Sequence, residues 1–211
     1  MLIGGGYAFT KTDVGMSGSV RKTETHAHNF FGYGHYQSGK MLYDLSAGYT
    51  YNHSEEKTLF SSGEYGSDQL SVQATVGYDA GGVVPKAGMR YINIRQHAYT
   101  DSLGQEVSSS SSELMTALGG FGVQTGKVNW TAEALATYDC VSDSDAMQVV
   151  LPNGSGYTVE AGKRLHRWGG EVSVQSEIRI GRKTALSAEY AGTFKKDYQS
   201  HTGMLKLRYD F

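Results

Sequence analysis

Hydrophobic and polar residues alternate along most of this chain of 211 residues, with a period of two. Such a period places successive side chains on opposite faces of an extended strand, whereas a helix repeats its apolar positions every three or four residues. No long window of the sequence shows the helical period. We predict ten strands, at residues 2–9, 26–36, 41–51, 70–78, 83–99, 114–124, 128–138, 171–180, 184–194 and 198–211.

The connections between these strands are short at one end and long at the other. The short ones contain glycine, which supplies the positive φ of tight hairpin turns, and lie at 37–40, 79–82, 125–127 and 181–183. The long polar ones lie at 10–25, 52–69, 100–113 and 139–168, with a shorter one at 195–200. Serine- and aspartate-rich stretches at 108–113 and 140–145 are typical of solvated loops. This asymmetry is typical of outer-membrane barrels, whose short turns face the periplasm.

Alternation alone does not say which face points outward, because a soluble barrel of the lipocalin kind also alternates. Three features favour apolar residues on the outside. A closed barrel of about ten strands is too wide for side chains to fill. The polar face carries charges in the middle of strands, and aromatic residues gather near strand ends, as in membrane-interface girdles. The girdle candidates are Tyr43, Tyr49, Tyr51, Tyr78, Tyr99, Trp130, Tyr138, Tyr209 and Phe211.

The fold class predicted from these patterns is all-β: a transmembrane antiparallel up-and-down β-barrel, with residues 1–211 as one domain. The composition agrees with this, because 28 Gly, 15 Tyr and only 2 Pro suit many strands joined by tight turns. A formal net charge of -2 gives no attraction to nucleic acid. The single cysteine, Cys140, excludes an internal disulfide.

The chain ends in the alternating sequence YQSHTGMLKLRYDF, residues 198–211. This segment resembles the last strand of the autotransporter β-domain of Gram-negative bacteria. Residues 83–99 and 129–139 resemble two further strands of that family, one beginning Pro-x-x-Gly-x-Arg-Tyr and one containing tryptophan, and residues 4–14 resemble an early strand. The terminal residues that match the family pattern are Tyr198, His201, Gly203, Leu205, Leu207, Arg208, Tyr209 and Phe211.

The resemblance implies a barrel of about twelve strands, with a helix that threads the pore and joins a secreted passenger domain. About ten strands are visible here, so we expect either a chain truncated at its N-terminal end or a ten-stranded variant. The implied function is that of a translocator and anchor in the outer membrane, with its C-terminus in the periplasm. The implied partners are outer-membrane lipid, the barrel-assembly machinery and the protein's own passenger and linker helix. We expect a monomer without enzymatic activity, cofactor or bound nucleic acid.

Two groups of residues are the candidate functional sites. One face of the last strand, with Leu205, Leu207, Tyr209 and Phe211, would act as the assembly signal read by the insertion machinery; alternatively, these residues only face lipid. Charges on the polar face could grip a linker helix, or could simply pair with one another in a wet lumen. These lumen charges are Arg90, Glu133, Glu177, Arg179, Glu189 and Arg208.

Alternative functions are an outer-membrane protease of the omptin kind, which has ten strands and acidic residues with histidine at its outer rim, and a passive adhesin or porin. Rim candidates for the protease are His97, Asp101, Asp139, Asp143, Asp145 and Asp197. His26 and His28 suggest a metal site only weakly, because the rest of a ligand shell is missing. We therefore expect no metal.

Overall fold

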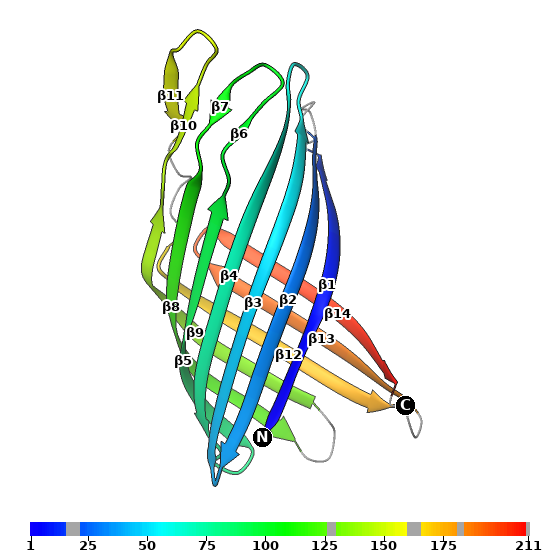
Figure 1. The fold of residues 1–211 in the computed structure, drawn as a ribbon. Coiled ribbons are helices and arrows are strands. Elements are labelled where there is room, and N and C mark those ends of the chain that lie inside the picture. The colour runs from blue at the N-terminus through cyan, green and yellow to red at the C-terminus, as the bar shows by residue number, and fades with distance from the viewer. Residues whose placement is uncertain (16–21, 126–129, 160–165, 181–183, 210–211) are drawn as a thin grey trace.

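The computed structural model describes residues 1–15, 22–125, 130–159, 166–180 and 184–209, and these residues form strands and turns without a helix. Ten strands form one antiparallel sheet in chain order, each paired with the next (Figure 1). They are β1 (Leu2–Gly15), β2 (Lys22–Ser38), β3 (Met41–Lys57), β4 (Ser62–Tyr78), β5 (Val83–Gln96), β8 (Ser110–Thr125), β9 (Trp130–Ser144), β12 (Trp168–Arg179), β13 (Thr184–Lys195) and β14 (Tyr198–Tyr209).

A second, small sheet extends two of the hairpins beyond the long strands. Its four short strands pair in the order β11-β10-β7-β6 and lie at the end of the molecule opposite to both chain termini (Figure 1). Their bounds are β6 (Tyr99–Thr100), β7 (Glu106–Val107), β10 (Met147–Val150) and β11 (Gly156–Val159).

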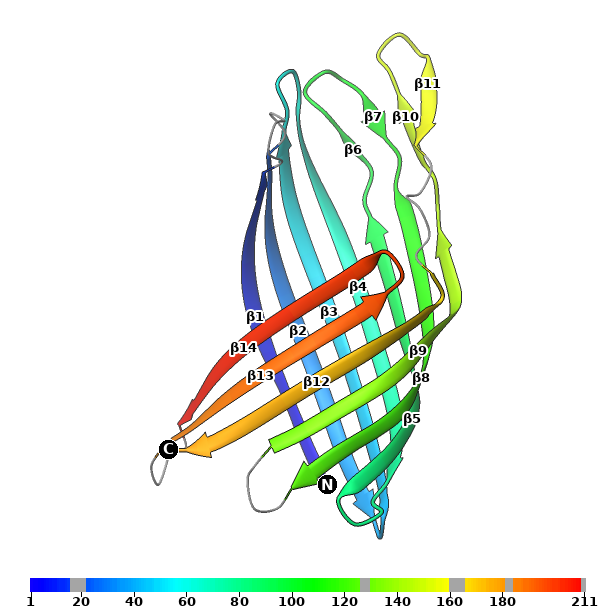
Figure 2. The ribbon, with the colours of Figure 1, turned by 180° about the vertical axis from the view of Figure 1, so that it is seen from behind.

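The short turns lie at the same end of the molecule as the two termini (Figures 1 and 2). Gly39 in the β2–β3 turn has φ 59, and Gly81 and Gly82 in the β4–β5 turn have φ 87 and 106. These left-handed values suit glycine because it has no Cβ, as the sequence predicted. Of the turn predicted at 125–127, Thr125 ends β8 and the rest falls outside the described residues, as does the turn predicted at 181–183.

All ten predicted strands are confirmed, but several run farther than predicted. The predicted loop 52–69 shrinks to residues 58–61, because β3 continues to Lys57 and β4 begins at Ser62. Likewise β8 begins at Ser110 and β9 runs to Ser144, inside stretches predicted as solvated loops. In these extensions both sheet faces can meet water, so the backbone ladder continues while the apolar alternation stops.

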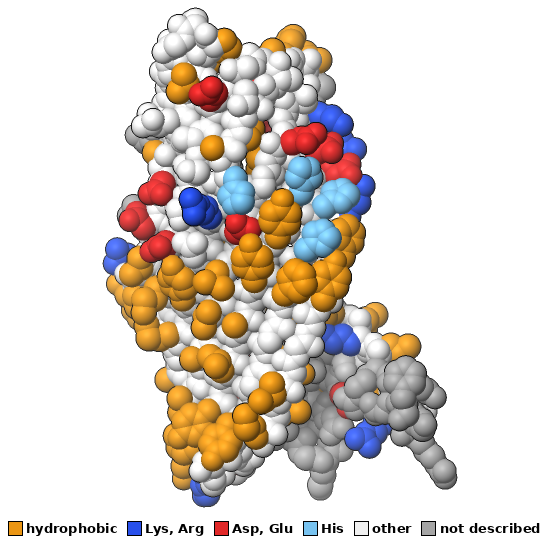
Figure 3. Space-filling model, viewed as in Figure 1, with side chains coloured by type: hydrophobic (Ala, Val, Ile, Leu, Met, Phe, Trp, Pro, Cys, Tyr) orange, Lys and Arg blue, Asp and Glu red, His pale blue; other side chains and the backbone are white. Residues whose placement is uncertain are grey.

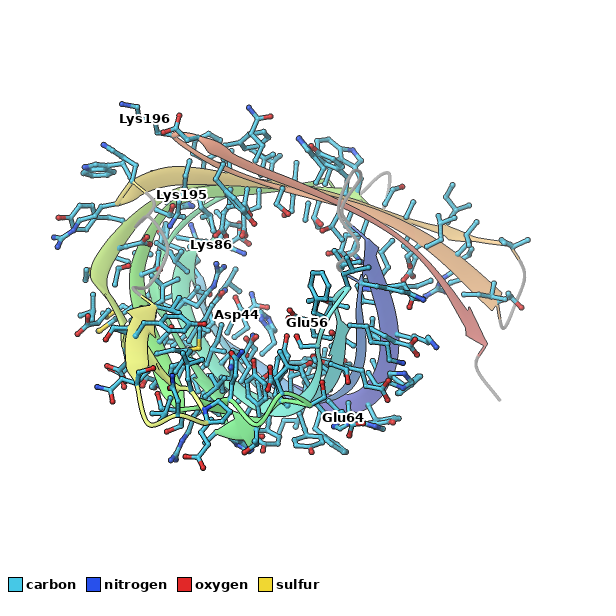
Figure 4. All side chains as sticks on the ribbon, turned by 90° about the horizontal axis from the view of Figure 1, so that it is seen from above. Asp44, Glu56, Glu64, Lys86, Lys195 and Lys196 are labelled. Atoms are coloured by element: carbon cyan, nitrogen blue, oxygen red, sulfur yellow. The ribbon has the colours of Figure 1, made fainter. Side chains whose placement is uncertain are left out.

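The long sheet curls around a central space, with β12 to β14 crossing the side opposite β3 to β5 (Figure 4). Asp44, Glu56 and Lys86 point to the inner side of this curl, and Glu64 lies on its outer side (Figure 4). β1 and β14 are the two ends of the sheet order, and within the described residues neither is paired with the other.

The apolar face of the sheet points outward, as predicted. Leu45, Phe121 and Leu205 are 57%, 54% and 76% exposed. The alternate positions on the inner side hold the buried residues, which are polar ones such as Thr75 and Ser187 together with apolar ones such as Leu118 and Leu135. The barrel is therefore inverted relative to a soluble protein, as the lipid-facing surface of a membrane barrel requires.

Outward aromatic residues form two groups along the strands. Near the short turns, the rings of Tyr36 and Tyr43 lie 6.0 Å apart, and farther along, the rings of Tyr7 and Phe30 lie 5.2 Å apart. Hydrophobic side chains cover the outer surface between these levels (Figure 3). The girdle predictions for Tyr43, Tyr49, Tyr51 and Tyr78 agree with their outward exposure of 40–44%.

The girdle prediction is wrong for Tyr99. This residue belongs to β6 of the small sheet, where its ring packs 5.2 Å from that of Tyr65. It lies beyond the barrel sheet because residues 97–109 leave the wall as a separate hairpin. The side chain of Tyr209 and the whole of Phe211 fall outside the described part of the chain.

Two inward-facing glycines mark places where neighbouring strands approach too closely for a side chain. A Cβ at Gly120 would lie 2.0 Å from the backbone oxygen of Ala134, and one at Gly88 would lie 2.3 Å from that of Ala74. The adjacent Gly119 faces the other way, and a Cβ there would meet nothing within 4 Å. The curl thus depends on glycine at particular inward positions.

This difference gives a matched test of the curl. We expect Gly120→Ala to destabilise the folded barrel by about 3 kcal/mol, because the backbone of β9 must move away. Gly119→Ala should leave stability unchanged or slightly raised. Heat-modifiable migration in SDS and urea unfolding in detergent micelles would measure both. Equal stability of the two variants would contradict this account.

Candidate functional site

The inner surface of the curl carries ion pairs that join strands lying apart in the sheet. The guanidinium of Arg90 on β5 donates to both carboxylate oxygens of Glu171 on β12, at 2.6 and 2.9 Å. Strands β8 and β9 lie between these two. Arg90 Nε also donates to Gln73 Oε1 on β4 at 2.7 Å. One arginine therefore ties together β4, β5 and β12, in the forked geometry that matches a carboxylate.

A second ion pair crosses over β8. Lys86 Nζ on β5 lies 2.5 Å from Glu133 Oε2 on β9. The β8 residues beneath this bridge are Gly120 and Gly122, and a Cβ at Gly122 would lie 3.7 Å from Lys86 Cε. The glycine-rich stretch of β8 leaves the inner surface low enough for the lysine to reach across.

A third pair crosses over β12 and is the most buried. Lys195 on β13 bonds Asp139 on β9, and their side chains are only 11% and 4% exposed. Thr116 Oγ1 donates a further hydrogen bond to Asp139 at 3.0 Å. Gly169 of β12 lies beneath, where a Cβ would come within 2.8 Å of Lys195 Cγ. Again a glycine on the intervening strand makes room for the bridge.

The remaining predicted lumen charges lie on the last three strands of the sheet, β12, β13 and β14. Glu189 on β13 accepts from Lys206 Nζ on β14 at 2.9 Å, in a more exposed setting. Ser187 Oγ donates to Glu177 at 3.4 Å. Arg179 ends β12, and Arg208 lies opposite Ala185 in the β13–β14 register, with its side chain outside the described part of the structure.

The predicted terminal-strand residues occupy one edge of the sheet. Leu205 and Leu207 on β14 lie opposite Ala188 and Leu186 of β13 and are 76% and 71% exposed. Tyr209 closes the register opposite Thr184. The structure thus places an apolar outward row along the last strand. The assembly-signal role remains a prediction.

Three of the rim residues named for the protease alternative have three different settings in the structure. Asp139 is not at the rim but buried on the inner wall with Lys195, because β9 continues past it. His97 does pair with an aspartate, Asp68, at 2.7 Å, but on the outer face of β4. Asp101 accepts the backbone N–H groups of Leu103 and Gln105 within its own loop.

Neither a metal site nor a membrane-spanning helix is found within the described ranges. No group of three or more His, Cys, Asp or Glu there could hold a metal ion. No described helix is long and apolar enough to cross a bilayer.

Sequence reasoning missed the partners of the lumen charges more than the charges themselves. Glu171 and Lys86 share the inward phase of Glu133 and Arg90, so alternation could have identified them. Asp139 and Lys195 were assigned to loops, and their pairing depends on how sharply the sheet curls. Chemically, these ion pairs match cations with anions, so the part of the wall that they form is polar and carries little net charge.

The buried pair gives a test of how the wall is held. Asp139→Ala should destabilise the barrel by about 4 kcal/mol, because Lys195 would be left buried without its carboxylate. Lys206→Met, which breaks the exposed pair with Glu189, should cost about 1 kcal/mol or less. Urea unfolding of both variants in micelles is the measurement. A similar small loss in both would show that Lys195 reaches water.

Known proteins resemble this chain in sequence and in structure. The family model described as autotransporter beta-domain matches residues 1–191. The translocator domain of the autotransporter NalP from Neisseria meningitidis is similar in structure, with a TM-score of 0.51 and 16% identity over 99% of this chain and 87% of that one. The transport unit of the autotransporter AIDA-I from Escherichia coli aligns over 99% of this chain and 88% of that one, with a TM-score of 0.38 and 11% identity. Comparison with curated proteins gave no match.

Proposed function

We propose, because this chain belongs to the autotransporter β-domain family, that it carries a passenger joined to its N-terminal side to the cell surface and anchors it there. The family consists of outer-membrane barrels of Gram-negative bacteria, and the outward apolar surface described above agrees with that location. The observation that carries the proposal is the inner wall. It is polar, and four of its cations, Lys86, Arg90, Lys195 and Lys206, each meet a carboxylate, so an extended chain would pass a wall on which these charges are already neutralised.

The proposed orientation follows from the two ends of the strands. The short turns and both termini would face the periplasm, and the strand extensions with the small sheet would face the outside. A passenger joined at the first residue would then begin on the periplasmic side and need to cross the lumen. The lumen charges are proposed to line this route by pairing with one another rather than by gripping a helix.

Surface display tests export directly. A secretion signal and an epitope-tagged segment would be placed before residue 1 and produced in a Gram-negative host. We expect antibody to label intact cells, with labelling lost after external protease treatment. The same epitope fused to a periplasmic carrier should label only after permeabilisation. Labelling of the barrel fusion only after permeabilisation would overturn the export proposal.

The terminal phenylalanine is proposed to act in assembly by the insertion machinery. Phe211→Ala should lower the amount of heat-modifiable barrel in the outer membrane at least several-fold. Phe121→Ala is the matched control, since it removes an outward ring that is 54% exposed on β8, far from the terminal strand in the sheet order. It is the same substitution of the same side chain away from the chain end. Equal losses in the two variants would reduce the role of Phe211 to lipid contact.

The proposal includes a monomer in lipid and no catalytic chemistry. Two of the rim residues that suggested a protease have other roles in the structure. Asp139 holds Lys195 on the inner wall, and His97 holds Asp68 on the outer face.

A further inference from the structure

Four of the seven histidines gather on the outer face of β2 to β5, immediately beyond the hydrophobic surface. Figure 3 shows histidines there among acidic and basic side chains, directly above a band of hydrophobic ones. Strand register and hydrogen bonds place His26, His28, His53 and His97 in this group. These four residues are called the histidine belt below.

The belt lies next to the aromatic group that contains Tyr7 and Phe30. His28 lies next to Phe9 and Tyr51 in the strand registers, and its Nδ1 is 2.8 Å from the hydroxyl of Tyr7. The Phe9 ring lies 5.2 Å from the His28 ring and 5.9 Å from the His26 ring. Because aromatic girdles mark the membrane interface, the belt stands at the height of lipid headgroups.

Carboxylates lie close to three of the four histidines. His26 Nε2 lies 2.9 Å from Glu24, His53 Nε2 lies 3.9 Å from Glu64, and His97 Nε2 lies 2.7 Å from Asp68. Asp13 and Glu55 form an acidic row with Glu24 and Glu64 across β1 to β4. The permanent cations around the belt are Lys11, Lys22, Lys57 and Arg95.

These groups make the local charge depend on protonation of the belt. With neutral histidines, the five carboxylates exceed the four lysine and arginine side chains by one negative charge. Protonation of all four histidines turns this into an excess of three positive charges. Unperturbed histidine changes its charge near pH 6.5, so the sign changes in mild acid.

Glu24 does not cancel this change, because it stays ionised in mild acid. Hydrogen bonds from Lys11 and then His26 lower the pKa of Glu24 from 4.5 to about 2. Because this pKa lies well below 4, Glu24 remains an anion between pH 6 and pH 4.

We propose that the histidine belt binds the phosphate groups of outer-leaflet lipid and does so more strongly in mild acid. Imidazolium and ammonium groups donate charge-assisted hydrogen bonds to phosphate oxygens, with Lys11 in the same row as His26. Placement in the outer leaflet rests on the orientation under the proposed function. The charge complementarity and the continuity with the aromatic surface come from the fold itself.

Lipid retention in micelles tests the belt without depending on that orientation. The refolded chain in nonionic detergent would be mixed with diphosphoryl lipid A or with phosphatidylcholine, and bound lipid measured after gel filtration at pH 7.5 and 5.5. We expect lipid A retention to rise roughly tenfold in acid, since each charge near an anionic lipid surface is worth about fivefold and the carboxylates offset part of it. Phosphatidylcholine retention should not change.

The variant that removes the effect is His26→Gln, His28→Gln, His53→Gln and His97→Gln combined. His35→Gln is the matched control, because His35 bonds Asp44 at 2.7 Å on the inner side, away from the belt. Single His26→Gln and His97→Gln variants, each expected to lose part of the rise, serve if the combined variant fails to show heat-modifiable migration.

Three outcomes would overturn the proposal. They are an unchanged acid response in the belt variants, an equal response with phosphatidylcholine, and acid-induced dimers in place of bound lipid. Loss of surface display with an intact lipid response would reject export but keep the belt. The reverse result would reject the belt alone.

Discussion

A chain that crosses hydrocarbon must pair its backbone N–H and C=O groups internally, because no water is present to replace a missing partner. Continuous antiparallel ladders from β1 to β14 meet that demand along this sheet. Once the backbone is paired, the side chains on each face can match the medium that they meet, which is lipid on the outside and water on the inside. Leu45, Phe121 and Leu205 then belong outside, where a soluble protein would bury them. The two edges of the ladder, β1 and β14, are the places where the same demand must still be met by another strand.

The inner wall follows from the same constraint. A curled sheet brings inward side chains closer together than their strand separation suggests, and isolated charges in a narrow space are costly. Arg90, Glu171, Lys195 and Asp139 therefore meet one another. Glycines on the strands between them make those meetings possible, as Gly169 does beneath Lys195. The polar character of the wall and its glycine content are two parts of one packing solution.

Much of the barrel could be predicted because lipid and water impose opposite demands on alternate residues. The inward phase of Arg90 and Glu133 and the outward phase of Leu205 and Leu207 were readable for that reason. The strand extensions were not, because residues such as Ser110 and Ser144 have water available on both faces and carry no alternation. The partners of the lumen charges could not be predicted either. Which cation meets which anion depends on curvature, and a linear sequence does not express curvature.

The bond between Arg90 and Glu171 has a consequence for misassembly. In a flat sheet the two strands would stand three spacings apart, about 14 Å, which is farther than the two side chains can bridge. A flat stack of these strands would therefore separate the arginine from the glutamate and leave both charges without their ion-pair partner. Only the curled form satisfies both, so this pair favours closure of the sheet and opposes the extended aggregates toward which exposed apolar strands otherwise tend.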